Sequence, residues 1–570
     1  MTLASDIVRA WRNLALRDFT PQLVTSLAGD YGFADLRKDA LAGLTVAVVA
    51  LPLGMALAIA SGVTPDKGLL TVIIAGFLIS VLGGSRVQIG GPTGAFVVIV
   101  YGVVEKHGPD GLVLATFMAG AILLAAAVLR VGAWMKYMPQ PVITGFTAGI
   151  AVIIASSQIK DILGEEGHVP AAMIPKLEML VSLLPTIRLE TILLAAGSLV
   201  TMLVLRRLAP RLPSFLIGVA LASFAAALLQ LPAATIGSEF GVLPRSLPAP
   251  HIPDISIEKL QLLLPSAFTI AFLAGLESLL SAVVADGMTG DRHRSHCELM
   301  AQGIANMVSA LFGGMPATGA IARTATNIRA GARSPLSGVF HALFVLLFMA
   351  LLAPLAGAIP LASLGAVLLI VAWNMSEVDQ IMRLMRGPWG DRFVLFATFA
   401  LTVFADLTLA IEAGVVMAAV LFMHRMAESV EFQLGVGHLG GDGEELPPHP
   451  DMRERLPPGV EAFQIRGPLF FGVSGRLLDV LDRTAARPTA FIIRMGQVPM
   501  IDTSGATALA DFVRRARARG IRVVVSGLRG QPLRILDEMG LISGAGHVET
   551  AQNFAAAIAL LEVRGHIGAS

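Results

Sequence analysis

Two glycine-rich segments, residues 83–95 and 313–323, interrupt a chain that otherwise consists largely of long apolar runs. Each is followed by too few apolar residues to cross a bilayer, which takes roughly 20 residues in a helix. Non-helical backbone at membrane depth is tolerated only where protein or a water-filled cavity covers it. Matched interruptions in two halves of a membrane protein indicate the binding site of a secondary transporter. We therefore expect a transporter whose site lies between the two breaks.

The composition is that of a membrane protein. Of 570 residues, 55% are hydrophobic and 15% are charged, whereas soluble domains average about 25% charged residues. The net charge of +1 gives no reason to expect nucleic-acid binding. The single cysteine, Cys297, excludes an intramolecular disulfide. The N-terminal residues lack a charged region followed by an apolar core, so we expect no signal peptide.

The apolar runs predict fourteen membrane spans, of which two are half-helices at 92–104 and 318–330. The other twelve lie at 39–61, 67–82, 111–130, 140–158, 189–205, 212–231, 262–285, 299–312, 335–353, 355–372, 393–405 and 407–424. Arginine and lysine gather in alternate connections, as the positive-inside rule requires if both termini are cytoplasmic. Each half has seven spans, an odd number, so the second half must be inverted relative to the first.

The composition changes after Arg425 and divides the chain into four parts. We expect an N-terminal cytoplasmic segment at 1–38, a transmembrane transport domain at 39–425, a linker at 426–458 and a soluble domain at 459–570. Within the last part, strands alternate with helices, which predicts a small α/β fold. The expected strands are 460–465, 468–471, 490–495 and 522–526, and the expected helices are 475–485, 505–519 and 532–539.

The sequence Asp502-Thr503-Ser504-Gly505 begins the second of these helices and has three interpretations. Its polar side chains cap the free N–H groups at a helix start. Alternatively, Ser504 is a phosphorylation site, because a phosphate is stabilised at a helix N-terminus. A nucleotide site is the weakest interpretation, because the GxxxxGK[ST] loop is missing.

The residues of the two breaks are suited to binding an anion. Pro92 fits the first turn of a helix, and Gly91 and Gly94 allow backbone to approach a ligand closely. The second break offers residues 317–320 at another helix start. Two helix N-termini facing one cavity supply N–H donors and positive dipole ends. The alternative is that both breaks are packing kinks.

Two charged residues lie inside the apolar spans. Glu277 is mid-span, and an intramembrane carboxylate is by default a functional candidate. Removal from water penalises its charge, which makes it a candidate proton carrier. Ser281, one turn later, shares its face and would bond to it or complete a cation site. Arg323 would either raise the positive potential at the site, pair with Glu277, or bind a backbone carbonyl.

A cluster of His293, His296 and Cys297 lies in a predicted cytoplasmic loop. Such side chains bind zinc, but beside Arg292 and Arg294 they more often serve topology, so we expect no metal. No arrangement of catalytic side chains stands out in the sequence. We therefore expect neither an enzyme nor a bound cofactor.

Five stretches of the membrane part resemble the sulfate permease (SulP, solute-carrier 26) family: residues 42–63, 90–95, 276–290, 301–338 and 371–377. The last three are most similar to the bacterial DauA-like branch of C4-dicarboxylate and sulfate transporters. Residues 464–541, with FQIRGPLFF and IDTSG, resemble a STAS domain, in which the phosphorylated serine corresponds to Ser504.

The resemblance implies a 7+7 inverted-repeat fold. Spans 1–4 and 8–11 would form a core that moves like an elevator against a gate of spans 5–7 and 12–14, in a homodimer. It places substrate-binding positions at Leu53, Gly91, Thr93, Gly94, Ala95, Thr318, Gly319, Ala320 and Arg323. It supports ion coupling at Glu277, to which Ser281 is added because of its place on the same helix face. Many members have glutamine where this chain has Leu53, and a leucine cannot donate a hydrogen bond to an oxyanion.

The expected function is secondary active transport of a small anion, sulfate or a C4-dicarboxylate, across the inner membrane. Glutamate at 277, as in the proton-coupled members, favours H⁺ over Na⁺ as the co-ion. Bicarbonate transport, anion exchange and a passive anion channel are the alternatives. A different class is a membrane-tethered regulatory module whose STAS domain binds a cytosolic partner.

Overall fold

The structure is a computed structural model that describes residues 18–29, 31–132, 138–165, 169–210, 212–405, 407–434, 456–473, 475, 477, 488–543 and 548–565. Three of the expected segments fall wholly or partly outside the described residues. They are the first 17 residues of the N-terminal segment, residues 435–455 of the linker and nearly all of the helix at 475–485. The chain divides into two compact units, Met1–Val416 and Met417–Ser570.

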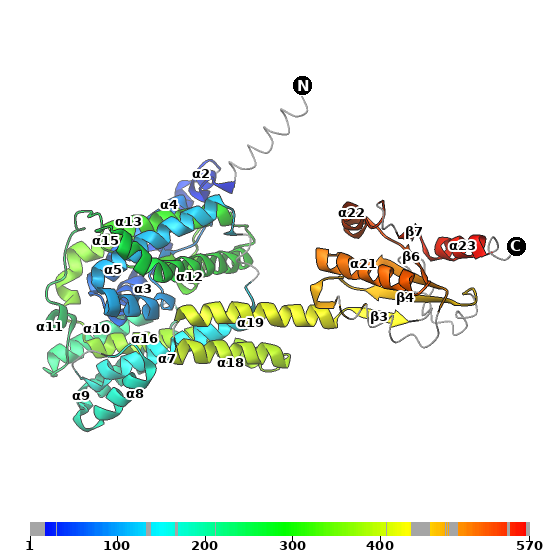
Figure 1. Ribbon diagram of the computed structural model, residues 1–570. Coiled ribbons are helices and arrows are strands. Elements are labelled where there is room, and N and C mark those ends of the chain that lie inside the picture. The colour runs from blue at the N-terminus through cyan, green and yellow to red at the C-terminus, as the bar shows by residue number, and fades with distance from the viewer. Residues whose placement is uncertain are drawn as a thin grey trace. The chain divides into compact units, whose positions relative to one another are not determined.

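The first half of the membrane unit follows the predicted order of spans (Figure 1). Its third span and fourth span form one element, α5, bent where Gly108 has a φ of +70° and Pro109 follows. Proline lacks the N–H that would continue the hydrogen bonding of the helix, and the helix therefore bends at this point. The helices are α2 (Gln22–Leu27), α3 (Phe33–Ala60), α4 (Pro65–Leu82), α5 (Ala95–Val128), α7 (Gln140–Leu163), α8 (Met173–Ser182), α9 (Leu189–Leu208) and α10 (Ser214–Leu228).

The second half repeats this pattern, with a short α14 where the first half has the start of α5. Its helices are α11 (Ile236–Phe240), α12 (Ile257–Thr289), α13 (Ser295–Leu311), α14 (Ile321–Arg329), α15 (Leu336–Ala356), α16 (Leu361–Met375), α17 (Val378–Leu384), α18 (Trp389–Phe404) and α19 (Leu407–Glu428). Among the described residues, nine helices are long and apolar enough to cross a membrane. Every predicted run falls on a helix, and the count of fourteen spans stays a prediction.

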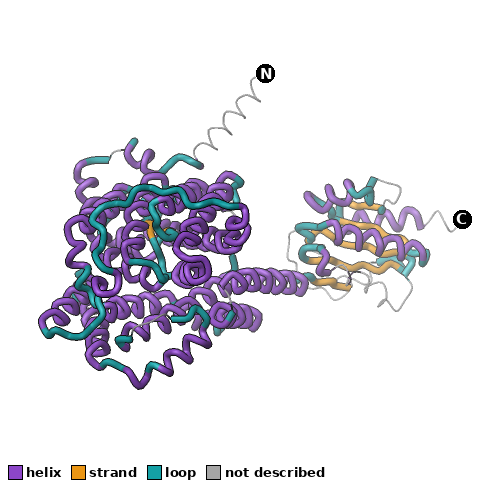
Figure 2. The backbone as a smooth tube through the Cα atoms, turned by 60° about the vertical axis from the view of Figure 1, so that its left-hand side comes forward, coloured by secondary structure: helices purple, strands orange, loops and turns teal. Residues whose placement is uncertain are grey.

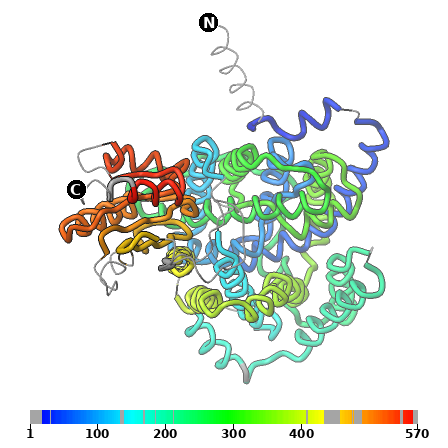
Figure 3. The backbone as a smooth tube through the Cα atoms, turned by 90° about the vertical axis from the view of Figure 1, so that its right-hand side faces the viewer, coloured from blue at the N-terminus to red at the C-terminus, as the bar shows by residue number. Residues whose placement is uncertain are grey.

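Helices of the two halves interleave, as the colours of Figure 3 show. Helix α5 packs on α12 and α13, and α15 packs on α3 and α4. A second group consists of α7, α9, α16 and α18, which pack on one another. These groups are the core and the gate that the inverted-repeat fold predicts.

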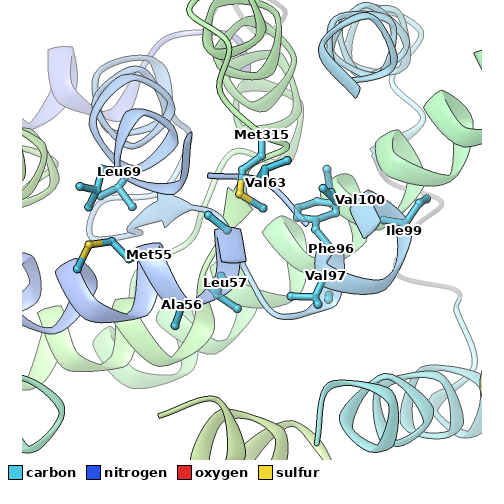
Figure 4. Packing of buried hydrophobic residues seen from close by; sticks show 14 of the residues in the cluster. Met55, Ala56, Leu57, Val63, Leu69, Phe96, Val97, Ile99, Val100 and Met315 are labelled. Atoms are coloured by element: carbon cyan, nitrogen blue, oxygen red, sulfur yellow. The ribbon is translucent and has the colours of Figure 1, made fainter. Parts of the chain in front are cut away.

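The two breaks meet inside the core. Strand β1 (Gly90–Gly91) pairs antiparallel with β2 (Thr318–Gly319). Figure 2 shows this strand pair enclosed by helices. Apolar side chains pack beside it: Phe96 and Val97 of α5 lie near Leu57 of α3, Val63 of the turn after α3 and Met315 of the second break (Figure 4). This buried hydrocarbon helps to fix the position of the first half-helix.

The second unit is a five-stranded sheet in the order β3-β4-β5-β6-β7. Phe463, Phe491 and Phe512 pack edge to face in its core. Strand β3 is antiparallel to β4, and the other neighbours are parallel. The elements are β3 (Glu431–Leu434), β4 (Val460–Arg466), η3 (Phe471–Val473), β5 (Ala490–Gln497), α21 (Thr503–Ala518), β6 (Arg522–Ser526), α22 (Gly530–Glu538), β7 (Glu549–Ala551) and α23 (Phe554–Gly565).

Two expectations about this unit are wrong. Residues 426–458 are not all linker, because residues 431–434 form β3 by pairing with β4. Residues 468–471 are not a strand: Leu469 makes only an isolated bridge to Ile501, and η3 follows. Pro468 has no N–H to donate to a neighbouring strand, which limits pairing there.

Candidate functional site

The first break brings a hydroxyl to the intramembrane carboxylate. Thr93 Oγ1 donates to Glu277 Oε2 over 2.7 Å, so α12 and the start of α5 meet through this bond. Both side chains are only half-buried, whereas the neighbouring Pro92, Gly94 and Ala95 are buried. The accessible polar pair at the start of α5 is therefore an acid and its hydroxyl donor. The sequence predicted both residues but not their contact.

Free backbone donors lie beside this pair. The first hydrogen bonds of α5 run from Phe96 N to Thr93 O and from Val97 N to Gly94 O. Within the described parts of the chain, the amides of Thr93, Gly94 and Ala95 donate to no other group. Such a helix start is a ready site for an anion. A Cβ on Gly94 would lie 2.4 Å from Met375 Sδ of α16, so glycine allows the core to approach the gate closely here.

At the second break, the hydrogen-bond donors bind neighbouring protein segments instead of remaining free. Ala320 N donates to Ile89 O over 2.8 Å, and Thr318 Oγ1 donates to Ala274 O over 2.7 Å. Thr318 and Gly319 are the residues of β2. The free amides of α14 are those of residues 321–323, because its first bond runs from Thr324 N to Ala320 O. The amide of Ala320, expected as an anion donor, is therefore already engaged.

Arg323 is buried and links the two breaks. Its side chain is 3% exposed, and its Nη2 donates to the carbonyl oxygen of Pro92. Gly91, with a φ of +149°, lies against it: a Cβ there would be 2.5 Å from Nη1. Of the three roles that the sequence left open, binding to a backbone carbonyl is the one that the structure shows.

Ser281 and Leu53 do not contact Glu277 through a polar bond. Ser281 Oγ lies 3.3 Å from Thr324 Oγ1, which also accepts from Ile89 N over 3.0 Å. Ser281 thus links α12 to the second half-helix. Leu53, on α3, is half-buried and packs against the apolar core.

A buried polar network next to the breaks was not predicted. Gln88 Nε2 donates to Ser278 Oγ over 2.9 Å, and Ser278 Oγ donates to Glu298 Oε1 over 2.9 Å. Glu298 is fully buried, and its Oε2 accepts from the amides of Gly84 and Ser85. A Cβ on Gly319 would lie 1.6 Å from Gln88 Nε2. Gly319 therefore makes room for this network. The sequence feature that could have indicated this network is the pair Glu298 and Gln302, at i and i+4 on a predicted membrane span.

The three side chains of the predicted cytoplasmic cluster have separate partners. His293 Nδ1 lies 2.7 Å from Asp286 Oδ2, and its Nε2 lies 2.9 Å from Ser295 Oγ. His296 stacks on Phe19, and Cys297 donates to Leu82 O. No group of three metal-ligating side chains occurs in the part of the chain that the structure describes.

In the soluble domain, Asp502 is the N-cap of α21. Its Oδ1 accepts from Gly505 N over 2.7 Å, and its Oδ2 accepts from Phe471 N over 3.2 Å. The capping interpretation is confirmed. Ser504 lies in the first turn with an exposed side chain, and its phosphorylation stays a prediction.

Comparison with known proteins identifies the family. The family described as "Sulfate permease family" matches residues 36–398, and the STAS domain matches residues 452–554. The Bacillus subtilis (strain 168) protein YvdB, whose name assigns it provisionally to sulfate transport, is 43% identical over 526 residues, covering 90% of this chain and 96% of YvdB. The bicarbonate transporter BicA of a Synechocystis strain is 30% identical over 521 residues, covering 89% of this chain and 91% of BicA.

Solved structures show the same fold. Murine Slc26a9, an anion transporter in the inward-facing state, has a TM-score of 0.85 at 17% identity and covers 96% of this chain and 95% of its own. The transmembrane domain of a cyanobacterial BicA has a TM-score of 0.61 at 30% identity, covering 67% of this chain and 98% of its own. The chain belongs to the sulfate permease family of anion transporters and ends in a STAS domain.

Proposed function

We propose that this anion transporter carries sulfate or a C4-dicarboxylate together with a proton, by movement of the core against the gate. The observation that carries the proposal is the bond from Thr93 to Glu277 at the free amides of α5. An ionised Glu277 repels an anion at these amides, because two like charges a few ångströms apart interact strongly away from bulk water. Protonation of Glu277 removes that repulsion.

The hydrogen bonding of Thr93 would change with the protonation state of Glu277, and this change would affect binding of the anion. While Glu277 is ionised, the Thr93 hydroxyl donates to it. A protonated Glu277 has its own hydrogen to donate to Thr93 Oγ1, which frees the Thr93 hydroxyl for the anion. Anion and proton would therefore bind together, and this is the basis of symport.

Bicarbonate is the second candidate substrate, because BicA is 30% identical over most of both chains. In either case we propose an inner-membrane homodimer with both termini in the cytoplasm and no nucleic-acid partner. The STAS domain would bind a cytosolic protein, with Ser504 as the regulated residue because it is exposed at a helix start.

The test is uptake into proteoliposomes of sulfate, succinate or bicarbonate, driven by an inward proton gradient. Wild-type protein should accumulate one of these anions, and Glu277→Gln should exchange it without responding to the gradient. Glu258→Gln, an exposed residue in the first turn of the same helix, is the matched control and should behave as wild type. Accumulation driven by sodium instead of protons, or normal proton-driven accumulation by Glu277→Gln, contradicts the proposal.

A further inference from the structure

The segment between α7 and α8 is bound to the half-helix that begins at the site. The hydroxyl of Tyr101 donates to the carbonyl oxygen of Val169. The amide of Ala171 donates to Glu105 Oε1 over 3.4 Å. Tyr101 and Glu105 both lie on α5, and Glu105 is ten residues beyond Ala95, or about 15 Å along a helix. The core is thus fastened to the gate at the end of α5's first half.

A buried cation follows directly in this segment. Lys176, on α8, is 2% exposed, and its Nζ donates to Ser157 Oγ of α7 over 2.8 Å. Within the described chain its ammonium has this neutral hydroxyl partner and no carboxylate at ion-pair distance. Burial lowers the pKa of Lys176 to about 8, and the Glu105 carboxylate opposes that shift.

A buried ammonium without an ion-pair partner needs an explanation, because desolvating an unpaired charge is costly. The carboxylate of Glu105, which favours the charged form of Lys176, is on the core, whereas Lys176 and Ser157 are on the gate. Any displacement of the core that carries Glu105 away leaves Lys176 with less compensation. The ammonium then attracts an anion more strongly.

We infer that Lys176 is a positioning residue at the outer end of the transport path, where it attracts the anion once the contacts of Tyr101 with Val169 and of Glu105 with Ala171 open. This inference rests on the proposed alternation of core and gate, and on the topology that places α8 outside. It assigns the residue to the approach of the anion, because Glu105, whose charge acts on Lys176, is about three helical turns along α5 from the free amides. Lys176 is therefore not part of the binding site itself.

The test measures the KM for anion uptake separately from each side of the membrane, in oriented proteoliposomes, using whichever of sulfate, succinate and bicarbonate the wild type transports. Lys176→Met should raise the KM at the outer side about tenfold and change the inner KM less than twofold, and Lys176→Arg should restore most of the affinity. The matched control is Lys259→Met, an exposed lysine on the same side that pairs with Asp254 over 2.6 Å, which should change neither value.

A structural role for Lys176 predicts a different pattern. Ser157→Ala removes the neutral partner and keeps the charge, so it should leave the outer KM within twofold of wild type. If Ser157→Ala reproduces the effect of Lys176→Met, or if Lys176→Met changes both sides equally or neither, the inference is overturned. Failure of proton coupling with a one-sided Lys176→Met effect would instead contradict the proposed function and leave this inference standing.

Discussion

The two breaks occupy matched positions in the inverted repeat but have different chemistry. At the first break, Thr93 and Glu277 are half-buried and the amides of residues 93–95 are free. At the second break, Thr318 is fully buried and both its hydroxyl and the amide of Ala320 are bound to protein. The difference is consistent with our proposal that the second break holds the first in place and that the first offers donors to the anion. Symmetry of fold does not imply symmetry of function.

The largest expected effect comes from Gly319→Val, which should disrupt the packing of the second break against the first. A Cβ at this position would lie 1.6 Å from Gln88 Nε2, and overpacking a core typically costs about 1–3 kcal/mol. We expect loss of transport together with a lower melting temperature in detergent. Gln88→Ala removes the side chain that a Cβ at position 319 would meet. The double variant Gly319→Ala with Gln88→Ala should therefore recover stability that Gly319→Ala alone loses.

If Gly319→Val were as stable as wild type and failed only in transport, the second break would contact the anion directly. The comparison of the two breaks would then be wrong.

The next largest effect should distinguish two carboxylates on neighbouring helices, Glu298 and Glu277, by whether their loss affects stability or proton coupling. Glu298 accepts from the amides of Gly84 and Ser85 and from Ser278, all buried, so Glu298→Gln should lower the free energy of unfolding by about 2 kcal/mol. Transport per folded molecule should remain proton-driven. Glu277→Gln should show the reverse, with unchanged thermal stability and lost coupling, in the same melting and uptake assays. Equal destabilisation by both variants would remove the distinction.

Arg323 should have an intermediate effect, because it both binds Pro92 O and carries charge. Arg323→Ala should raise the KM about tenfold, which corresponds to about 1.4 kcal/mol. Arg323→Lys keeps the charge and loses the planar fork, so the fraction of affinity that it restores measures the contribution of charge alone. A wild-type KM in Arg323→Ala would show that neither property reaches the first break.

The smallest effects separate the two threonines. Thr318→Val removes the bond to Ala274 O and should cost about 1 kcal/mol of stability with an unchanged KM. Thr93→Val should raise the KM with unchanged stability, because Thr93 is half-buried beside the free amides. Thr93→Ser and Thr318→Ser keep both hydroxyls and should be near wild type. A raised KM in Thr318→Val would place the anion at both breaks.

Local patterns were enough to predict the breaks and the acid. Glycine and proline around residues 90–94 mark interrupted helix, and Glu277 stands out because charge is rare inside an apolar span. The order of spans followed from the same contrast between apolar and charged residues. These signals lie within a few residues of one another, so the sequence contains them directly.

Contacts across the chain could not be predicted in this way. Ala320 loses its free amide to Ile89, and Glu298 finds donors at Gly84 and Ser85, in each case more than 200 residues away. Strand β3 is similar, because its assignment depends on pairing with β4 beyond residues 435–455. Which donors remain free at a site is decided by such long-range pairing.

The most direct test of the central claim is equilibrium binding of the transported anion to purified protein as a function of pH. If the anion binds at the first break only when Glu277 is neutral, wild-type affinity should fall as pH rises through the range in which Glu277 ionises. Affinity of Glu277→Gln should be high and independent of pH over the same range. A Glu277→Gln protein that keeps the wild-type pH dependence would contradict the account, because the proton that controls binding would then be carried by another group.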